Sequence, residues 1–202
     1  MKRDRKAYII PGYGQSTRCK EYRKLADIAT KFGYEAVKVN PDWSKGSFEH
    51  WTNTFLEAVD DRTSKKSIVI GFSFGAIIAL QASQKIALNK VFLCSLSPYF
   101  SKDLVDLPKS VSRAFGKRFM SSLKDNHYPD SSTTSAFFIF GENDWPVAIE
   151  KARSIFSRYA GKKKFCLVKD ADHSLTDEYL LHIERLLKLG GKNPGNARLL
   201  LS

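Results

Sequence analysis

Short apolar runs alternate along this chain with segments in which apolar residues recur every three or four positions. Runs of this kind are typical of buried strands, and the spaced residues are typical of helices that pack one face against a sheet. The runs predict six strands, at residues 7–10, 34–39, 68–70, 90–97, 136–140 and 165–168. The spacing predicts helices over residues 22–32, 48–62, 75–82, 107–123, 146–159 and 174–189.

Turn and cap residues mark where several of these elements begin and end. Gly33 and Gly161 follow predicted helices, as expected of C-terminal caps, and Pro146 suits the first position of a helix. The spacing from Ser174 to Asp177 predicts a capping interaction at the start of the last helix. These boundaries agree with a regular alternation of strands and helices.

This alternation specifies an α/β fold, because each strand-helix-strand unit adds one more strand to a parallel sheet. We expect a three-layer α/β/α sandwich around a mostly parallel six-stranded sheet. The run at residues 90–97 is apolar throughout, as expected for a strand that helices cover on both faces. Since no repeat or linker divides the chain, we expect one domain over residues 1–191 and a C-terminal tail over residues 192–202.

The connection from residue 99 to residue 135 has no strand pattern. Apolar residues recur there every four positions, which predicts one amphipathic helix with Leu107, Val111, Phe115, Phe119 and Leu123 on its apolar face. The opposite face carries a cationic stripe of Lys109, Arg113 and Lys117. This stripe is either a solvated surface or a receptor for an anionic substrate, and we favour the solvated surface.

The basic excess of the chain has the same two interpretations. The 202 residues include 33 Lys and Arg against 21 Asp and Glu, a formal net charge of +12. Such an excess can attract nucleic acid, anionic membranes or acidic substrates. Apart from short clusters at residues 1–6 and 162–164, the basic residues are spread along the chain, so we expect a solvated surface and no nucleic-acid partner.

The cysteines and the apolar runs bear on the compartment. Cys19, Cys94 and Cys166 are odd in number and lack C-x-x-C spacing, and two of them fall in predicted strands, which is typical of buried thiols in a reducing compartment. The apolar run at residues 7–10 is too short for a signal peptide, and no run is long enough to span a membrane. We therefore expect a cytoplasmic protein, with no metal or cofactor.

Candidate chemistry begins at the third predicted strand. Gly71, Ser73 and Gly75 form the pattern G-x-S-x-G between a strand and a helix. In this context the serine lies on a strained turn that exposes its hydroxyl, and the amide of the next residue, Phe74, faces the carbonyl that the serine attacks. The pattern also occurs by chance as a glycine-flanked loop serine, so the other residues of a catalytic site decide between the two interpretations.

A serine nucleophile needs a histidine base and an acid that orients the histidine. Among the four histidines, His50 and His182 fall in predicted helices and His127 in an irregular connection, whereas His173 follows a strand. Asp144 follows the fifth strand, and we favour it as the acid. Asp103 is the main alternative, and Asp170 and Asp172 are close to the histidine in sequence.

The chain from Tyr8 to Leu189 resembles the α/β-hydrolase superfamily in four segments: PGYGQS, GFSFGA, GENDWP and DADHS. The resemblance implies an oxyanion hole made of the amides of Tyr13 and Phe74. The family often has His-Gly where this chain has Pro11-Gly12. The usual two leading strands are also absent, so the resemblance implies a minimal fold that starts at the third strand of the usual sheet.

Larger members of that family insert a lid domain where this chain has only residues 98–134. We therefore expect a shallow, open substrate pocket, with Gly12, Tyr99, Phe100 and Trp145 among its lining residues. Such a pocket suits a small acyl group better than a long one. The expected activity is that of a serine hydrolase acting on a small-molecule carboxylic ester or thioester.

Two other functions fit the same residues. The first is a non-catalytic binding module that keeps this fold and holds an acidic partner on its basic surface. The second is cleavage of amides or carbon-carbon bonds by the same side chains, since fold and triad do not set the substrate.

Overall fold

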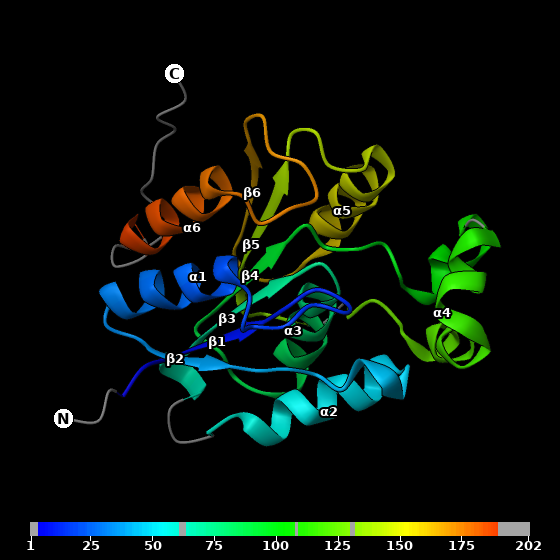
Figure 1. Cartoon of the computed structure of the whole chain (residues 1–202), viewed down its shortest axis with the longest axis horizontal. Coiled ribbons are helices and arrows are strands. Elements are labelled where there is room, and N and C mark those ends of the chain that lie inside the picture. Colours follow the sequence, from blue (N-terminus) through cyan, green and yellow to red (C-terminus); the bar gives the residue numbers. More distant parts are fainter. Residues whose placement is uncertain (1–3, 61–63, 108, 130–131, 190–202) are drawn as a thin grey trace.

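A computed structural model describes residues 4–60, 64–107, 109–129 and 132–189. Its centre is one six-stranded sheet in the order β2-β1-β3-β4-β5-β6, and every neighbouring pair is parallel (Figure 1). The strands are β1 (Lys6–Ile10), β2 (Glu35–Lys38), β3 (Ile68–Phe72), β4 (Lys90–Cys94), β5 (Ser135–Gly141) and β6 (Lys163–Val168). The prediction of six strands in an α/β fold is confirmed.

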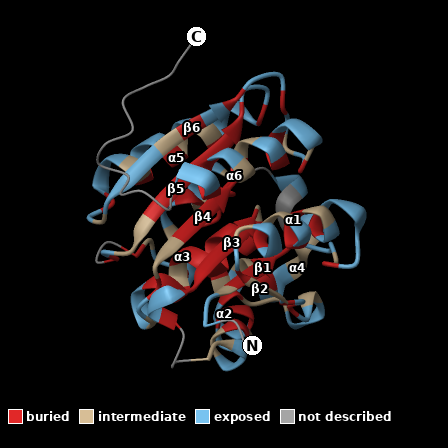
Figure 2. Ribbon diagram, turned by 90° about the vertical axis from the view of Figure 1, so that its left-hand side faces the viewer, coloured by how far each residue is buried: buried red, intermediate tan, exposed pale blue. Residues whose placement is uncertain are grey.

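Helices cover both faces of the sheet. They are α1 (Lys20–Lys31), α2 (Phe48–Ala58), α3 (Phe74–Lys85), α4 (Lys109–Ser122), α5 (Pro146–Arg158) and α6 (Asp177–Leu189). Buried residues of α1 and α6 pack against one face, and those of α2, α3 and α5 pack against the other. Figure 2 shows the central strands β1, β3, β4 and β5 as a buried layer between helices whose outer sides are exposed, whereas the edge strands β2 and β6 are partly exposed.

Side chains of each strand alternate between the two faces, which builds two separate cores. In β1, Tyr8 and Ile10 join the core beneath α2 and α3, whereas Ala7 and Ile9 join the core beneath α1 and α6. All four of these side chains are fully buried. The continuous apolar character of the strands is thus the result of burial on both faces.

The chain changes direction across the sheet between β1 and β3, which are neighbours although β2 lies between them in sequence. The helix after β1 lies on one face and the helix after β3 on the other. The loops that follow these two strands therefore separate at the carboxyl edge of the sheet. Ligand sites of open α/β sheets form at this kind of position.

The segment after β4 differs from its prediction. The strand ends at Cys94 rather than at residue 97, because Ser95 has φ 46° and leaves the extended conformation. Helix α4 is not one continuous helix, since Gly116 has φ 77° and ψ 173° and kinks it. Glycine reaches this conformation without a Cβ penalty, and the four-residue spacing continues across the kink. The side chain of Val111 lies outside the described part of the chain.

Two predicted helix caps also differ. Gly33 has φ 84° and ends α1 as expected, but α5 ends before Gly161, and that glycine is instead required by close packing. A Cβ on Gly161 would lie 2.4 Å from the carbonyl oxygen of Thr134. At the start of α6, the side chain of Thr176 accepts a hydrogen bond from the Tyr179 amide at 3.4 Å, in the role predicted for Ser174.

Cys94 and Cys166 are buried as expected, and Cys19 is exposed. Within the described ranges, no helix combines the length and the apolar character that crossing a membrane requires. The predicted tail, residues 192–202, lies outside those ranges.

Candidate active site

Ser73 lies between β3 and α3 in a conformation that few residues adopt. Its φ is 55° and its ψ is −114°, and its amide donates a hydrogen bond to the Cys94 carbonyl at 2.8 Å. Backbone strain of this kind costs about 1–3 kcal/mol and persists where the surroundings enforce it. The turn holds the serine at the carboxyl edge of the sheet, half-buried rather than covered.

The two glycines that flank this turn are required by close packing of the backbone. A Cβ on Gly71 would lie 2.2 Å from the carbonyl oxygen of Gly75. A Cβ on Gly75 would lie 2.3 Å from the carbonyl oxygen of Ile10, at the end of β1. The G-x-S-x-G pattern therefore has a steric cause in this chain: α3 begins in contact with the strand beside it.

Side chains from three strand ends meet at this turn. Nε2 of His173 lies 3.1 Å from Oγ of Ser73, and Nδ1 of the same imidazole lies 2.7 Å from Oδ1 of Asp144. The histidine belongs to the loop after β6, and the aspartate to the loop after β5. The arrangement can act as a nucleophile, a base and an acid that orients the base.

Asp144 is held as an anion in this arrangement. Burial by itself raises the pKa of its carboxyl group, but the hydrogen bond and charge of His173, together with hydrogen bonds from Ser95 and the Trp145 amide, outweigh burial, so the pKa lies below its ordinary value. The backbone amide of Trp145 donates a further hydrogen bond to Oδ1 at 2.7 Å. Because an ionised carboxylate only accepts hydrogen bonds, Nδ1 of His173 must donate and Nε2 is left to accept a proton from Ser73.

A second serine contacts the candidate nucleophile. Oγ of Ser97 lies 2.9 Å from Oγ of Ser73, and Ser97 is 1% exposed. Since the Ser73 hydroxyl donates to the imidazole, the Ser97 hydroxyl donates to Ser73. The sequence did not indicate this contact, and the only signal at Ser97 was its place at the end of the strand predicted over residues 90–97.

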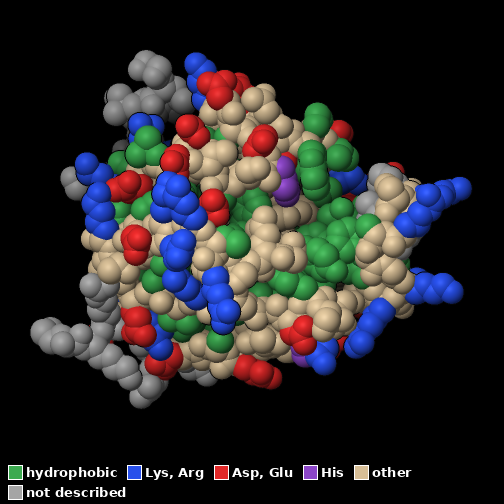
Figure 3. Space-filling view, in the orientation of Figure 1, with side chains coloured by type: hydrophobic (Ala, Val, Ile, Leu, Met, Phe, Trp, Pro, Cys, Tyr) green, Lys and Arg blue, Asp and Glu red, His purple; other side chains and the backbone are tan. Residues whose placement is uncertain are grey.

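The cavity above Ser73 holds about 210 Å³ and is mostly aromatic. Three of the four residues predicted to line it do so: Gly12, Tyr99 and Trp145. Tyr13, Phe72, Phe74 and Phe115 add rings to the wall, and Gln15 and Ser97 add polar groups. Figure 3 shows hydrophobic side chains that gather at the surface beside α4.

Phe100 does not line this cavity, contrary to the prediction. Its amide donates to Oδ2 of Asp103 at 3.0 Å, and its ring packs edge-on against Tyr128 at 5.8 Å. It lies instead beside a different cavity that Lys102 and Lys151 also line. The chain turns between Tyr99 and Phe100, and the two aromatic side chains therefore face different surroundings.

The residues predicted for the oxyanion hole both line the cavity that holds Ser73. Phe74 is the first residue of α3, so its amide has no acceptor within the helix. The rings of Tyr13 and Phe74 pack at 5.2 Å, which brings the loop after β1 against the start of α3.

Trp145 covers the candidate base. Its ring stacks on the imidazole of His173 with centroids 4.1 Å apart and planes 3° apart, although the tryptophan is 48% exposed. Pro146 at the first position of α5 fixes the backbone beside it. This stacking contact restricts the orientation of the His173 imidazole.

The other candidate residues lie elsewhere. Asp103, the alternative acid, pairs with Lys151 at 2.7 Å. Asp170 and Asp172 are exposed in the loop before His173. Of the other histidines, His50 lies on α2, His182 lies on α6, and His127 contacts Ser101 at 2.9 Å.

No protein-family model matches the chain, and no curated protein matches it in sequence. Solved structures do match it. A protein from Agrobacterium vitis S4 named "Putative hydrolase" has a TM-score of 0.77 and 18% identity, over 91% of this chain and 87% of its own. Alpha/beta hydrolase domain-containing protein 10 from mouse has a TM-score of 0.75 and 14% identity, over 90% of this chain and 87% of its own. Est1E from Butyrivibrio proteoclasticus has a TM-score of 0.73 and 12% identity, over 92% of this chain and 86% of its own.

Proposed function

Starting from the α/β-hydrolase fold that this chain shares with those structures, we propose that it is a serine hydrolase that cleaves a small carboxylic ester or thioester. The observation that carries the proposal is the continuous hydrogen-bond chain from Asp144 through His173 to Ser73. Two of the three similar proteins carry hydrolase in their names, which supports the reaction class.

Each residue has a defined role in the proposed acylation step. His173 takes the proton of the Ser73 hydroxyl as its oxygen attacks the substrate carbonyl, and Asp144 stabilises the imidazolium that forms. The amides of Tyr13 and Phe74 bind the negative oxygen of the tetrahedral intermediate. The intermediate then collapses, the bond to the leaving group breaks, and His173 returns its proton to the leaving oxygen or sulfur.

Water completes the cycle by the same route. His173 takes a proton from a water molecule, the resulting hydroxide attacks the acyl group on Ser73, and the serine leaves with the proton that His173 returns. The cycle turns an ester or thioester and water into a carboxylic acid and an alcohol or thiol and regenerates the free enzyme, so no redox partner is needed.

The size of the cavity favours a short acyl group. Pockets for drug-sized ligands hold roughly 300–1,000 Å³, whereas this one holds about 210 Å³. Its aromatic walls at Tyr99 and Phe115 favour an apolar acyl group over a charged one. We therefore expect turnover of p-nitrophenyl esters to fall as the acyl chain lengthens, and equal or better turnover of long chains would contradict this part of the proposal.

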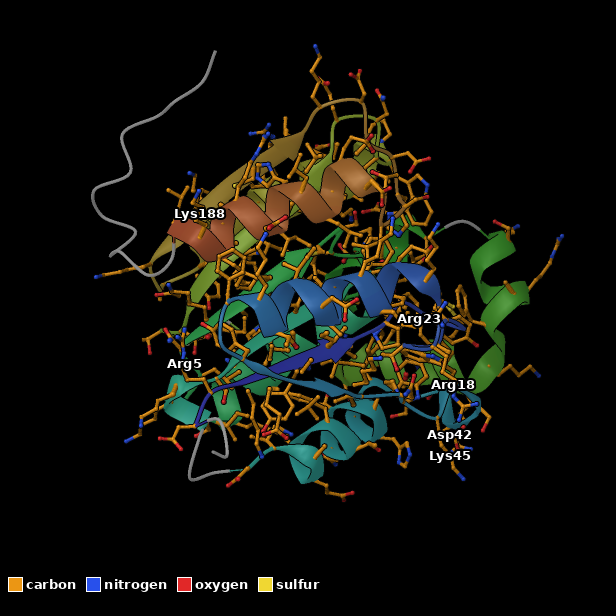
Figure 4. All side chains as sticks on the ribbon, turned by 60° about the vertical axis from the view of Figure 1, so that its left-hand side comes forward. Arg5, Arg18, Arg23, Asp42, Lys45 and Lys188 are labelled. Atoms are coloured by element: carbon orange, nitrogen blue, oxygen red, sulfur yellow. The ribbon has the colours of Figure 1, made fainter. Side chains whose placement is uncertain are left out.

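Two assays with one variant test the proposed reaction. A fluorophosphonate probe should label the wild-type protein and leave Ser73→Ala unlabelled, with ester turnover lost in parallel. Polyanion binding is measured on both proteins, because a non-catalytic binding module would bind polyanions with steep salt dependence and turn over no ester. Among the basic side chains labelled in Figure 4, Lys188 and Arg5 lie far from Arg18 and Lys45.

A further inference from the structure

A second cavity adjoins the first one at the candidate base. It holds about 330 Å³ and lies between the start of α1 and the loop that precedes α6. Gln15 and His173 line both cavities, so the two meet at these side chains. The reaction proposed above does not yet use this second space.

Gln15 is fixed in one orientation at this junction. Its side-chain oxygen accepts hydrogen bonds from the Gly12 amide, at 3.2 Å, and from the Tyr22 hydroxyl. A backbone amide can only donate, so the atom that faces it must be the oxygen of the Gln15 side chain. Burial raises the pKa of the Tyr22 phenol, so this phenol keeps its proton and donates.

The NH2 group of Gln15 is consequently turned away from these two partners. Within the described ranges, it donates to no residue. It is thus a hydrogen-bond donor whose position is set in advance, at the place where the two cavities meet. Such fixed donors favour binding because little freedom is lost when a ligand arrives.

The polar groups of the second cavity differ from those of the first. Glu21 and Ser174 contribute a carboxylate and a hydroxyl to its wall, whereas aromatic rings make most of the wall of the first. Glu21 disfavours an anionic ligand here. A ligand with several hydroxyl groups fits all three polar groups, because each hydroxyl both donates and accepts.

Because His173 lines both cavities, its chemistry as the base suggests which part of a substrate the second cavity holds. The base returns its proton to the leaving oxygen, so that oxygen must lie next to Nε2. We propose that the second cavity binds the leaving group, that this group is a polyol such as glycerol, and that Gln15 donates a hydrogen bond to one of its hydroxyl oxygens. This inference rests on the proposed serine hydrolase function.

Two esters of the same acid test the inference. The ratio of kcat/KM for glycerol monoacetate to that for ethyl acetate isolates the leaving group, because the acyl group is constant. We expect a ratio of about ten or more in the wild type, from one or two hydrogen bonds. Ser174→Ala and Glu21→Gln should each lower the ratio on the order of two- to tenfold, through loss of the glycerol ester rate alone. Gln15→Met should lower the ratio by a similar factor and slow both esters, because Gln15 also lines the cavity that holds Ser73.

Glu178→Gln is the matched control for Glu21→Gln, because both variants remove one negative charge. Glu178 lies in the first turn of α6, as Glu21 lies in the first turn of α1, and both are exposed, but Glu178 does not line the cavity. Glu178→Gln should leave the ratio unchanged. Gln15→Met also removes the acceptor of the Tyr22 hydroxyl and one of the two acceptors of the Gly12 amide, the other being the Tyr22 hydroxyl at 3.1 Å. If this variant fails to fold, Ser174→Ala and Glu21→Gln decide the matter.

The outcomes separate this inference from the proposed function. Equal turnover of the two esters by the wild type, or an equal loss on both esters in the variants, overturns the leaving-group assignment. It is also overturned if neither ester is cleaved while a fluorophosphonate still labels Ser73. If the wild type is neither labelled nor active on any ester, the serine hydrolase proposal itself fails.

Discussion

Replacing Ser97 with alanine tests whether the second serine assists the nucleophile. Its hydroxyl donates to Oγ of Ser73 over 2.9 Å, in a position that is 1% exposed. As the proton of Ser73 moves to His173, the Ser73 oxygen gains negative charge. The hydrogen bond from Ser97 therefore becomes charge-assisted in the transition state.

The magnitude follows from the difference between the two kinds of hydrogen bond. A bond between neutral groups contributes about 0.5–1.5 kcal/mol, and a bond to a charged group about 1.5–3 kcal/mol. The transition state thus gains about 1–1.5 kcal/mol more than the ground state, which corresponds to roughly five- to thirteenfold in rate. We expect Ser97→Ala to lower kcat/KM and the rate of fluorophosphonate labelling about tenfold.

Ser83→Ala is the matched control for this variant. Ser83 lies on α3, is also buried, and does not line the cavity that holds Ser73. Its hydroxyl contacts the Ser132 hydroxyl at 2.8 Å. Each variant loses a buried hydrogen bond and should lose about 1 kcal/mol of unfolding free energy. Thermal unfolding measures that loss in both. If Ser97→Ala keeps the wild-type kcat/KM, the assisting role is refuted.

Three further predictions concern the same edge of the sheet. Trp145→Ala should lower kcat/KM several-fold with little loss of stability, because an aromatic pair contributes about 0.5–1.5 kcal/mol and this indole is half exposed; steady-state kinetics and thermal unfolding measure the two effects. A kcat/KM profile should rise with pH and then stay level, since only neutral His173 can accept the Ser73 proton. The lowered pKa of Asp144 keeps its carboxyl ionised at and above the ordinary range of an aspartate, so it adds no second step there. Gly75→Ala should cost more than about 2 kcal/mol of unfolding free energy, because its Cβ would lie 2.3 Å from the carbonyl oxygen of Ile10; chemical denaturation measures the loss.

Each of these three predictions can be contradicted by a specific result. Unchanged kinetics in Trp145→Ala would mean that the stacked ring does not hold the imidazole. A flat pH profile would remove His173 from the role of base. A Gly75→Ala protein as stable as the wild type would show that α3 can move away from β1 at no cost.

The sheet was predictable because burial on both faces leaves continuous apolar runs, and these runs survive in the sequence as a plain signal. The kink at Gly116 left no such signal. Its flanking apolar residues keep helical spacing whether or not the backbone between them is helical. Periodicity records which residues face the core, and a single positive φ does not disturb it.

The candidate site shows a similar division. Ser73, Asp144 and His173 follow predicted strands, and parallel strands bring their carboxyl ends to one edge, so their meeting could be foreseen. Ser97 and Gln15 could not be assigned in this way. Their positions depend on where the chain turns after a strand, at Ser95 and at Gly12, and on hydrogen bonds between residues distant in sequence.

The most direct measurement is the site at which a fluorophosphonate bonds to the protein, found by mass spectrometry of tryptic peptides. Cleavage after Lys66, Lys85, Lys90 and Lys102 places Ser73 in the peptide of residues 67–85, and places Ser95 and Ser97 in the peptide of residues 91–102. We expect the adduct on Ser73 alone, and no adduct in Ser73→Ala or His173→Ala. An adduct in the peptide of residues 91–102, or labelling that persists in Ser73→Ala, would contradict the assignment of Ser73 as the nucleophile.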